Sequence, residues 1–244
     1  MWQVDNVIAE SDLKTAIIVG ASSSIGRAIS ARFRGPAARV ITTYASQAPV
    51  SPEERTGALH LDLRDDAGID AFVRQVKDIS PRIDIAIFLS GILPGKSLNA
   101  YEFSEIDEVM SINFSGQAKV LLRMLPLLTA RSRVLMFSSI SAQRGSFDPI
   151  YAASKGALLS FVKSLAPRLP SGARINAIAP GLIQDSTMFR EMTTERQEYH
   201  RGQVPSKHLL RQKDLADVVF DLCQNHWAHL NGACIDLNGG QYVR

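Results

Sequence analysis

Tyr151 and Lys155 lie four positions apart in the stretch "DPIYAASKGALLSF" (148–161), with only small residues between them. On a helix this spacing places both side chains on one face, one turn and roughly 6 Å apart along the axis. A phenol, with a pKa of ~10, transfers protons slowly near neutral pH, and a neighbouring ammonium favours the phenolate and lowers that pKa. The pair could therefore give and accept a proton. Because the spacing also arises by chance, the alternative is a tyrosine half inside the core beside a solvated lysine.

The segments that must position this pair alternate between two kinds. Short β-branched runs predict strands at 15–20, 39–44, 58–63, 83–89, 133–139, 174–180 and 233–239. Amphipathic stretches predict helices at 25–34, 66–79, 104–128, 151–167 and 213–224. Most of the strand runs are apolar almost throughout, so both of their faces should be buried. The sequence therefore predicts one α/β domain over residues 1–244, a doubly wound Rossmann-type fold with a seven-stranded, mostly parallel sheet and helices on both faces.

Composition excludes several classes of function. The 244 residues carry a net charge of +3, which is too small to indicate a nucleic acid or an anionic membrane as partner. The longest apolar runs are short and carry a charge, so no membrane span is expected. The first 14 residues lack a basic and then apolar leader, which favours a cytoplasmic protein. Cys223 and Cys234 form no CxxC and should stay reduced, and the five histidines show no spacing typical of a metal site.

A glycine-containing loop, "GASSSIGRAI" (20–29), follows the first predicted strand directly. Gly20 permits a tight turn, and Gly26 lets the next helix pack closely on the strand. Hydroxyl and backbone N–H groups that could bind phosphate come from Ser22, Ser23 and Ser24. This is the corner at which a dinucleotide pyrophosphate rests on helix N-terminal amides. The spacing is not G-x-G-x-x-G, and a plain strand–turn–helix corner is the alternative.

Five short motifs occur in a fixed order: "GASSSIG", "NFSG", "FSSIS", "YAASK" and "NAIAPG". Together they resemble the short-chain dehydrogenase/reductase family over roughly residues 12–244, and the ending "NGACIDLNGGQYV" looks like that of the 3-oxoacyl carrier-protein reductase branch. The resemblance implies an NAD(P)-dependent ketoreductase that moves a hydride between nicotinamide and a small ketone, secondary alcohol or acyl thioester. A dinucleotide-binding regulator without turnover is the alternative, but such proteins commonly lose the tyrosine or the lysine that this chain retains.

The same resemblance implies a role for each motif residue. Tyr151 would be the general acid–base, and Lys155 would lower its pKa and hydrogen-bond the nicotinamide ribose. Ser139 would polarise the carbonyl; Ser138 stays a rival, because Ser139 precedes the tyrosine by 12 residues where many relatives have 13. Asn113 would hold a water that links Lys155 to solvent as a proton relay.

Cofactor contacts are also implied by the resemblance. Asp62, after the third strand, would contact adenine, and the other expected contacts are Ile25, Leu63, Ser90, Gly91, Pro180, Gly181 and Ile183, with Ser186 or Thr187 as candidates for the carboxamide. Tyr44 and Ala45 stand where an acidic or a basic residue usually selects NAD or NADP. No carboxylate there repels a phosphate, and the hydroxyls of Ser23, Thr43 and Ser46 could bind one. The sequence therefore favours NADP over NAD, although no arginine or lysine lies at that position.

The chain departs from the family's pattern at two positions, and one long segment near its end has an expected role in substrate binding. Phe88 and Leu89 replace asparagines of the family's NNAG motif, a change that bears on stability more than on chemistry. Residues 186–212 are expected to form a mobile substrate lid, with Met188, Phe189 and Met192 over the nicotinamide and basic residues that could attract an anionic substrate. The alternative is a solvated amphipathic helix. Relatives are commonly tetramers, and the apolar faces at 106–128 and 151–165 predict a homotetramer here.

Overall fold

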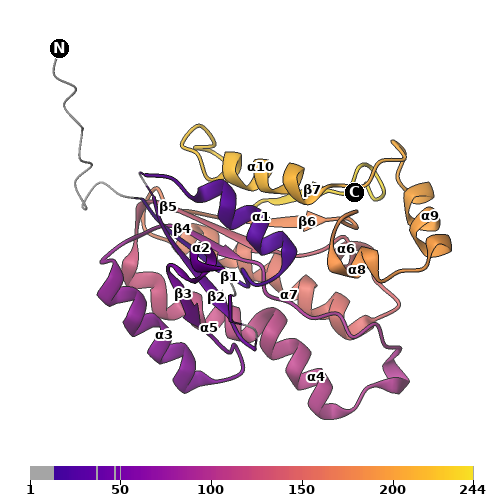
Figure 1. Ribbon diagram of the computed structural model, residues 1–244, viewed down its shortest axis with the longest axis horizontal. Helices are drawn as coiled ribbons and strands as arrows, with labels where there is room; N and C mark the ends of the chain where they lie inside the picture. The colour runs from indigo at the N-terminus through magenta and orange to yellow at the C-terminus, as the bar shows by residue number, and fades with distance from the viewer. Residues whose placement is uncertain (1–13, 37, 47, 50, 244) are drawn as a thin grey trace.

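A seven-stranded sheet lies at the centre of the computed structural model, which describes residues 14–36, 38–46, 48–49 and 51–243 (Figure 1). The strand order is β3-β2-β1-β4-β5-β6-β7, and every neighbouring pair is parallel. The strands are β1 (Lys14–Val19), β2 (Ala38–Tyr44), β3 (Ala58–His60), β4 (Ile83–Phe88), β5 (Leu128–Phe137), β6 (Arg174–Pro180) and β7 (Cys234–Leu237). The predicted fold class is confirmed. Most of the N-terminal stretch used to argue against a leader lies outside the described residues.

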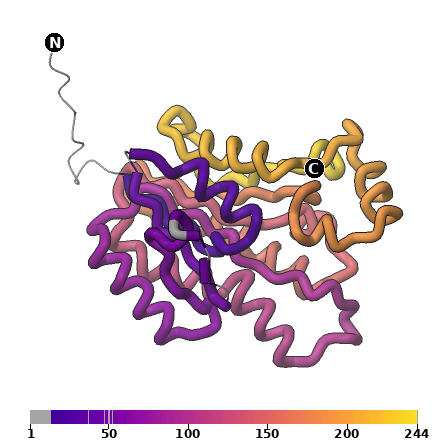
Figure 2. The backbone as a smooth tube through the Cα atoms, viewed as in Figure 1, coloured from indigo at the N-terminus to yellow at the C-terminus, as the bar shows by residue number. Residues whose placement is uncertain are grey.

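Helices cover both faces of this sheet. They are α1 (Ser24–Phe33), α2 (Pro52–Arg55), α3 (Asp66–Ile79), α4 (Phe103–Met110), α5 (Gly116–Met124), α6 (Ser141–Arg144), α7 (Pro149–Leu165), α8 (Thr187–Arg190), α9 (Thr194–Gln203) and α10 (Gln212–Leu222). Figure 2 shows α1 and α10, in indigo and yellow, side by side although they lie far apart in the sequence. Their contact includes the rings of Phe33 and Phe220, whose centroids are 5.2 Å apart. Within the described chain, no helix has the length and apolar character needed to cross a bilayer.

Successive residues of each central strand pack alternately into two separate hydrophobic cores, one on each face of the sheet. Ile17 and Val19 of β1 pack into the core beneath α3, α5 and α7, whereas Ile18 packs into the core beneath α1 and α10. All three side chains are at most 1% exposed. Burying an aliphatic side chain of this size contributes about 1.5–3 kcal/mol. Because both faces are covered, the central strands are apolar almost throughout, as the sequence indicated.

Three predicted elements differ most from the structure, and the bounds of the others agree within two residues. The third strand ends at His60 instead of residue 63, because β3 is an edge strand whose pairing with β2 stops there. The fifth strand begins at Leu128, five residues early, and the polar stretch that follows Leu128 hid this start from the hydrophobic pattern. The predicted helix 104–128 is divided into α4 and α5 by a π-helical turn and ends in a short 3₁₀ turn.

Candidate active site

The β1–α1 corner has the glycine geometry that the sequence predicted. Gly20 adopts φ +89°, and a Cβ added there would lie 2.7 Å from the backbone nitrogen of Ser90. A Cβ on Gly26 would lie 2.6 Å from the Cα of Ala21, so the helix can approach the loop only without a side chain. The structural reason proposed for both glycines is therefore confirmed.

The three loop serines differ in their contacts. Ser23 caps α1: its hydroxyl accepts a hydrogen bond from the Gly26 amide at 3.0 Å. The Ser24 hydroxyl accepts one from the Gln212 side chain at 3.1 Å, while Ser22 is exposed. The amides of Ser24 and Ile25 belong to the first helical turn and have no acceptor within the helix, and they lie at the positive end of its dipole. This donor set fits an anionic group such as a pyrophosphate.

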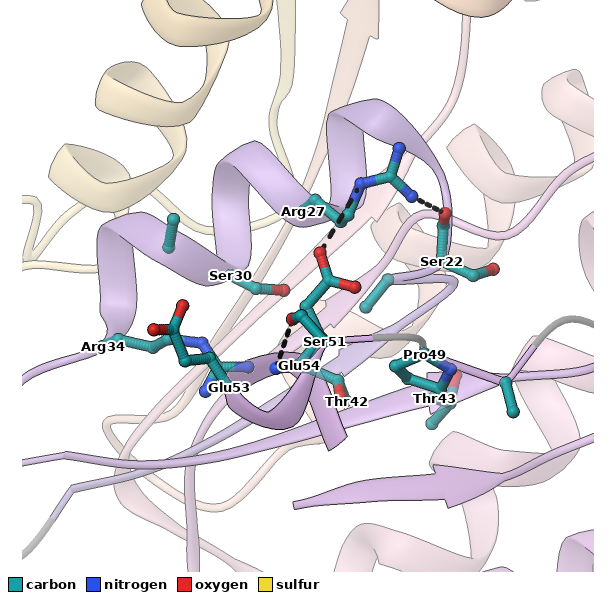
Figure 3. A pocket seen from close by; sticks show the side chains of 13 residues that line it. Ser22, Arg27, Ser30, Arg34, Thr42, Thr43, Pro49, Ser51, Glu53 and Glu54 are labelled. Atoms are coloured by element: carbon teal, nitrogen blue, oxygen red, sulfur yellow. Dashed lines mark hydrogen bonds and ion pairs between the residues drawn. The ribbon is translucent and has the colours of Figure 1, made fainter. Parts of the chain in front are cut away.

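A cavity of about 270 Å³ opens beside this corner, between α1, β2 and the segment that carries α2 (Figure 3). The guanidinium of Arg27 points into it, donating to the Ser22 carbonyl and lying 3.8 Å from the Glu54 carboxylate. On the sheet side, the Thr43 hydroxyl accepts from the Gly20 amide at 3.0 Å. Arg27 was missed because only the end of the second strand was searched for a cation. The signal was its place on the first turn of α1, directly after Gly26.

At the end of β3, Asp62 is fixed by a neighbour that the sequence reasoning did not single out. Its carboxylate accepts from the Arg64 backbone amide at 2.9 Å and from the guanidinium at 2.8–3.3 Å. These hydrogen bonds hold the pKa of Asp62 below its ordinary value. Arg64 also pairs with Glu108 of α4 at 2.6 Å. Asp62 is therefore an oriented, ionised acceptor at the carboxyl end of the sheet, and Leu63 beside it is buried.

The π-helical turn, Ser111–Ser115, places Asn113 inside the protein. The Gly116 amide donates to the Ser111 carbonyl five residues earlier, which defines the wide turn. The buried Gln117 side chain donates to the carbonyls of Ile112 and Asn113 and, at 2.8 Å, to that of Ser90, two residues after β4. Gln117 thereby satisfies carbonyl groups in the widened turn and ties the turn to the sheet. Nothing in the sequence pattern indicated this role.

Asn113 is completely buried, and three hydrogen bonds hold its side chain. Its side-chain oxygen accepts from the Ile92 amide at 2.8 Å, and its nitrogen donates to the Ile92 carbonyl at 3.0 Å and the Ser154 hydroxyl at 2.9 Å. A Cβ on Gly91 would lie 2.9 Å from Lys155 Nζ and 3.4 Å from Asn113 Oδ1. Both polar atoms therefore face the same point above Gly91, and a side chain at this position would displace the Lys155 ammonium.

Ser138 and Ser139 follow β5 and have different partners. The Ser138 hydroxyl donates to the backbone carbonyl of Lys155 at 2.8 Å and is buried. The Ser139 hydroxyl accepts from the Ser141 amide at 3.1 Å and also interacts with the Tyr151 hydroxyl, an interaction that favours the phenolate. Ser139 thus faces the phenol, whereas Ser138 fixes α7 against the sheet.

The expected effect of Lys155 on Tyr151 is not what the structure shows. Burial raises the pKa of the Tyr151 phenol, Ser139 opposes this shift and the charge of Asp148 adds to it. Lys155 is 4% exposed, and burial lowers its own pKa to about 8. The prediction that Lys155 lowers the tyrosine pKa was wrong, because it counted the charge of the ammonium and left out the burial of the phenol.

On the substrate side, the segment 186–212 contains α8 and α9 and has a small core of its own, made by Phe189, Val204 and Leu209. Phe189 is 4% exposed inside that core, whereas Met188 is exposed. The Ser186 hydroxyl caps α8 and donates to the Ile183 carbonyl at 2.8 Å. The loop after β6 is held by Gly181, whose amide donates to the Leu237 carbonyl at 2.9 Å. Figure 1 places α8 and α9 at the same end of the molecule as α6.

Comparisons with known proteins cover almost the whole chain. A family model described as enoyl-(acyl carrier protein) reductase matches residues 20–241. The chain is 28% identical over 240 residues to the 3-oxoacyl-[acyl-carrier-protein] reductase FabG of Escherichia coli (strain K12), covering 94% of this chain and 98% of that protein. It is 26% identical over 242 residues to the FabG of Aquifex aeolicus (strain VF5), covering 94% and 97%. The short-chain dehydrogenase/reductase SDR:glucose/ribitol dehydrogenase structure from Brucella melitensis matches with a TM-score of 0.85 at 26% identity, over 96% of this chain and 99% of that chain.

Proposed function

Because the chain belongs to the short-chain dehydrogenase/reductase family of NAD(P)-dependent oxidoreductases, we propose that it interconverts a ketone and a secondary alcohol with Tyr151 as general acid–base. One observation carries this proposal. Ser139 faces the Tyr151 hydroxyl. Lys155 lies on the same helix as Tyr151, and its Nζ and the Oδ1 of Asn113 face one point above Gly91. The β1–α1 corner, whose amide donors fit a pyrophosphate, follows β1, and β1 pairs with β4, the strand that leads to Gly91.

The nicotinamide cofactor, when bound, supplies or takes up the hydride. Negative charge then develops on the carbonyl oxygen of the ketone, and a proton must reach that oxygen. Because burial raises its pKa, Tyr151 carries its proton at neutral pH and can donate it. The Ser139 hydroxyl, already directed at the phenol, would hydrogen-bond the same oxygen and polarise the carbonyl.

Lys155 and Asn113 would support this proton transfer from the inner side. With a pKa of about 8, the Lys155 ammonium is mostly protonated at pH 7 and can donate to a ribose hydroxyl. Asn113 Oδ1 accepts one hydrogen bond from the Ile92 amide and has a second lone pair available. A water above Gly91 could therefore bridge Asn113 Oδ1 and Lys155 Nζ, as a first step of the proton relay.

Arg27 favours NADP as the cofactor, against the charges of Glu53 and Glu54, which line the same cavity. Arg27 brings a guanidinium to the cavity beside the glycine loop, where a ribose 2′-phosphate would need a cation. Ser22 and Thr43 line the same cavity. Asp62 and Leu63 would contact the adenine, and Pro180, Gly181 and Ile183 would lie along the nicotinamide.

The test is a substrate screen that includes an inactive variant. NADPH oxidation would be followed with a 3-oxoacyl thioester, a β-ketoester, a cyclic ketone and a 2-enoyl thioester, for the wild type and for Tyr151→Phe. Ketone turnover that Tyr151→Phe abolishes, with NADPH affinity retained, supports the proposal. NADPH binding without turnover of any compound would identify a regulator, and turnover of the 2-enoyl thioester alone would identify a double-bond reductase.

We also propose that the protein is a cytoplasmic homotetramer. Leu122 on the outer side of α5 is 60% exposed, as expected if that helix packs against another copy. Sedimentation at a mass near one chain of 26.7 kDa would contradict this assembly.

A further inference from the structure

Asp148 is a buried carboxylate, 1% exposed, that lies three residues before Tyr151 and binds two separate segments. Its Oδ1 accepts from the Tyr151 backbone amide at 2.9 Å and so caps α7. Its Oδ2 accepts from the amides of Gly95 at 2.9 Å and Lys96 at 3.3 Å. The Tyr101 hydroxyl lies 2.8 Å from both oxygens. One side chain therefore joins the first turn of α7 to a segment about 50 positions earlier in the sequence.

These contacts exceed what a helix cap requires. Asp65 caps α3 with a single hydrogen bond, from the Ala67 amide at 3.0 Å, and its side chain is exposed. Asp148 instead receives hydrogen bonds from three amides and a phenol, which is what makes a buried carboxylate tolerable. Within the described chain no lysine or arginine forms an ion pair with Asp148, since the Lys96 ammonium pairs with Glu105. The partners of this buried carboxylate in the described chain are therefore hydrogen-bond donors that carry no charge.

The segment that Asp148 holds borders the candidate active site. We call residues 92–101 the outer segment. It begins directly after Gly91, the residue that approaches Lys155, and both backbone groups of Ile92 are fixed by Asn113. Three and four residues later, Asp148 fixes Gly95 and Lys96, and the segment ends at Tyr101. Asn113 thus holds the beginning of the outer segment, and Asp148, which caps α7, holds the rest.

We propose that Asp148 is a positioning residue, which sets the outer segment as a wall of the substrate site against the turn of α7 that carries Tyr151. This inference rests on the proposed function, because the wall matters only if a ketone meets Tyr151. The negative charge has a second effect: it raises the pKa of the Tyr151 phenol and so favours the proton-carrying form. Losing the carboxylate would therefore loosen the wall and ease ionisation of the phenol.

The charged and titratable groups around Asp148 are few. The outer segment contributes Tyr101 and Lys96, and α4 contributes Glu105, whose charge acts on Tyr101. From α7 the groups are Tyr151 and Lys155, and from α6 the charged side chain is Arg144. Glu105 is neutralised by Lys96, so Asp148 is the carboxylate whose charge acts on Tyr151.

Asp148→Asn tests the proposal, because asparagine still caps a helix but cannot accept from the Gly95 and Lys96 amides with its nitrogen. We expect the KM for the ketone to rise and kcat/KM to fall by about 10- to 100-fold, the effect of losing hydrogen bonds to a charged group. We also expect the alkaline limb of the pH profile, set by Tyr151, to move to lower pH. Tyr101→Phe keeps the charge, so it should raise the KM and leave that limb in place. Asp65→Asn, the exposed cap of α3, should change neither quantity.

A second measurement does not depend on turnover. Ionisation of Tyr151 can be followed by ¹³C-tyrosine NMR, with Tyr151→Phe used to assign the signal. A titration that moves to lower pH in Asp148→Asn supports the effect of the Asp148 charge on Tyr151 whether or not a ketone is reduced. If that shift is seen and no ketone is reduced, the proposed function has failed and the coupling of Asp148 to Tyr151 stands. A folded Asp148→Asn protein with unchanged KM and an unchanged titration would overturn it and leave Asp148 as an ordinary cap. A Tyr151 titration that moves to higher pH in Asp148→Asn would also overturn the proposal.

Discussion

The ammonium group of Lys155 donates a hydrogen bond to the carbonyl oxygen of Phe137 at 2.8 Å, joining α7 to the last residue of β5. Ser138, the residue after β5, makes a second link to α7 by donating to the Lys155 carbonyl. Within the described chain no carboxylate forms an ion pair with Lys155, so a neutral carbonyl is the partner of this buried cation. Because burial removes the ammonium from water and one carbonyl replaces little of that hydration, the charged form of Lys155 destabilises the folded protein.

Lys155→Met should therefore alter the pH dependence of stability. The pKa of Lys155 is about 8 in the folded protein and 10.5 ordinarily, so its charge opposes folding fully below pH 8 and progressively less up to pH 10.5. The free energy of unfolding of Lys155→Met minus that of the wild type should fall by on the order of 3 kcal/mol across this range. Urea unfolding at several pH values measures it. Burial raises the pKa of Cys223 to about 12, but this thiol is present in both proteins, so its contribution cancels in the difference. A difference in the free energy of unfolding that stays constant with pH contradicts the prediction.

Ser139→Ala and Ser138→Ala form a matched pair. Ser139 faces the Tyr151 hydroxyl, so its loss should lower kcat by ~10²–10³-fold, the usual effect of removing one donor to a developing oxyanion. Ser138→Ala removes the hydrogen bond to the Lys155 carbonyl and should cost about 1 kcal/mol of stability, with a smaller effect on kcat. Steady-state kinetics and thermal unfolding of both variants decide the matter. The reverse order of kcat values would assign the catalytic role to Ser138.

Gly91→Ala should impair the reaction without unfolding the protein. The new methyl group would lie 2.9 Å from Lys155 Nζ and would push the ammonium away from its present position. We expect at least a tenfold loss of kcat/KM, about 1.4 kcal/mol of transition-state stabilisation. Gly35→Ala is the control, because a Cβ there would meet no atom within 4 Å. Equal activity of Gly91→Ala and the wild type would show that the close approach has no functional role.

Arg27→Ala should weaken NADPH binding selectively. If the guanidinium binds the 2′-phosphate, its loss should raise the Kd for NADPH by about 10- to 100-fold and leave the Kd for NADH unchanged. Arg32→Ala is the control on the same helix, since Arg32 bonds Asp217 at 2.9 Å and stacks on Phe220. Nicotinamide fluorescence measures both constants. A similar loss for the two cofactors would place Arg27 outside the phosphate site.

The sequence was sufficient for features whose causes are local. Strands appeared as apolar runs because both faces of the sheet are covered. The tight turn at Gly20 and the close packing of the helix at Gly26 could be predicted from the glycines themselves. Tyr151 and Lys155 share α7, so their common helix followed from spacing alone. The roles assigned to these residues stay predictions until the variants are measured.

Features that depend on tertiary contacts were not predictable in this way. Asp148 followed by proline is a readable helix start, yet its partners at Gly95 and Tyr101 lie about 50 residues away. The direction of the Tyr151 pKa shift depends on how deeply the phenol is buried, which no spacing reveals. The widened turn at Asn113 depends on Gln117 reaching Ser90 across the fold.

That widened turn makes the length of the α4–α5 segment critical. A π turn holds one residue more than the α-helix would need for the same span, so removing a single residue from 111–115 would restore regular winding. Everything on the amino-terminal side would then rotate by about 100° relative to α5. The deletion would spare the hydrophobic face of α5 and carry the Asn113 amide away from Ile92 and Ser154. One surplus residue in this helix is therefore what holds the Asn113 side chain in the candidate active site.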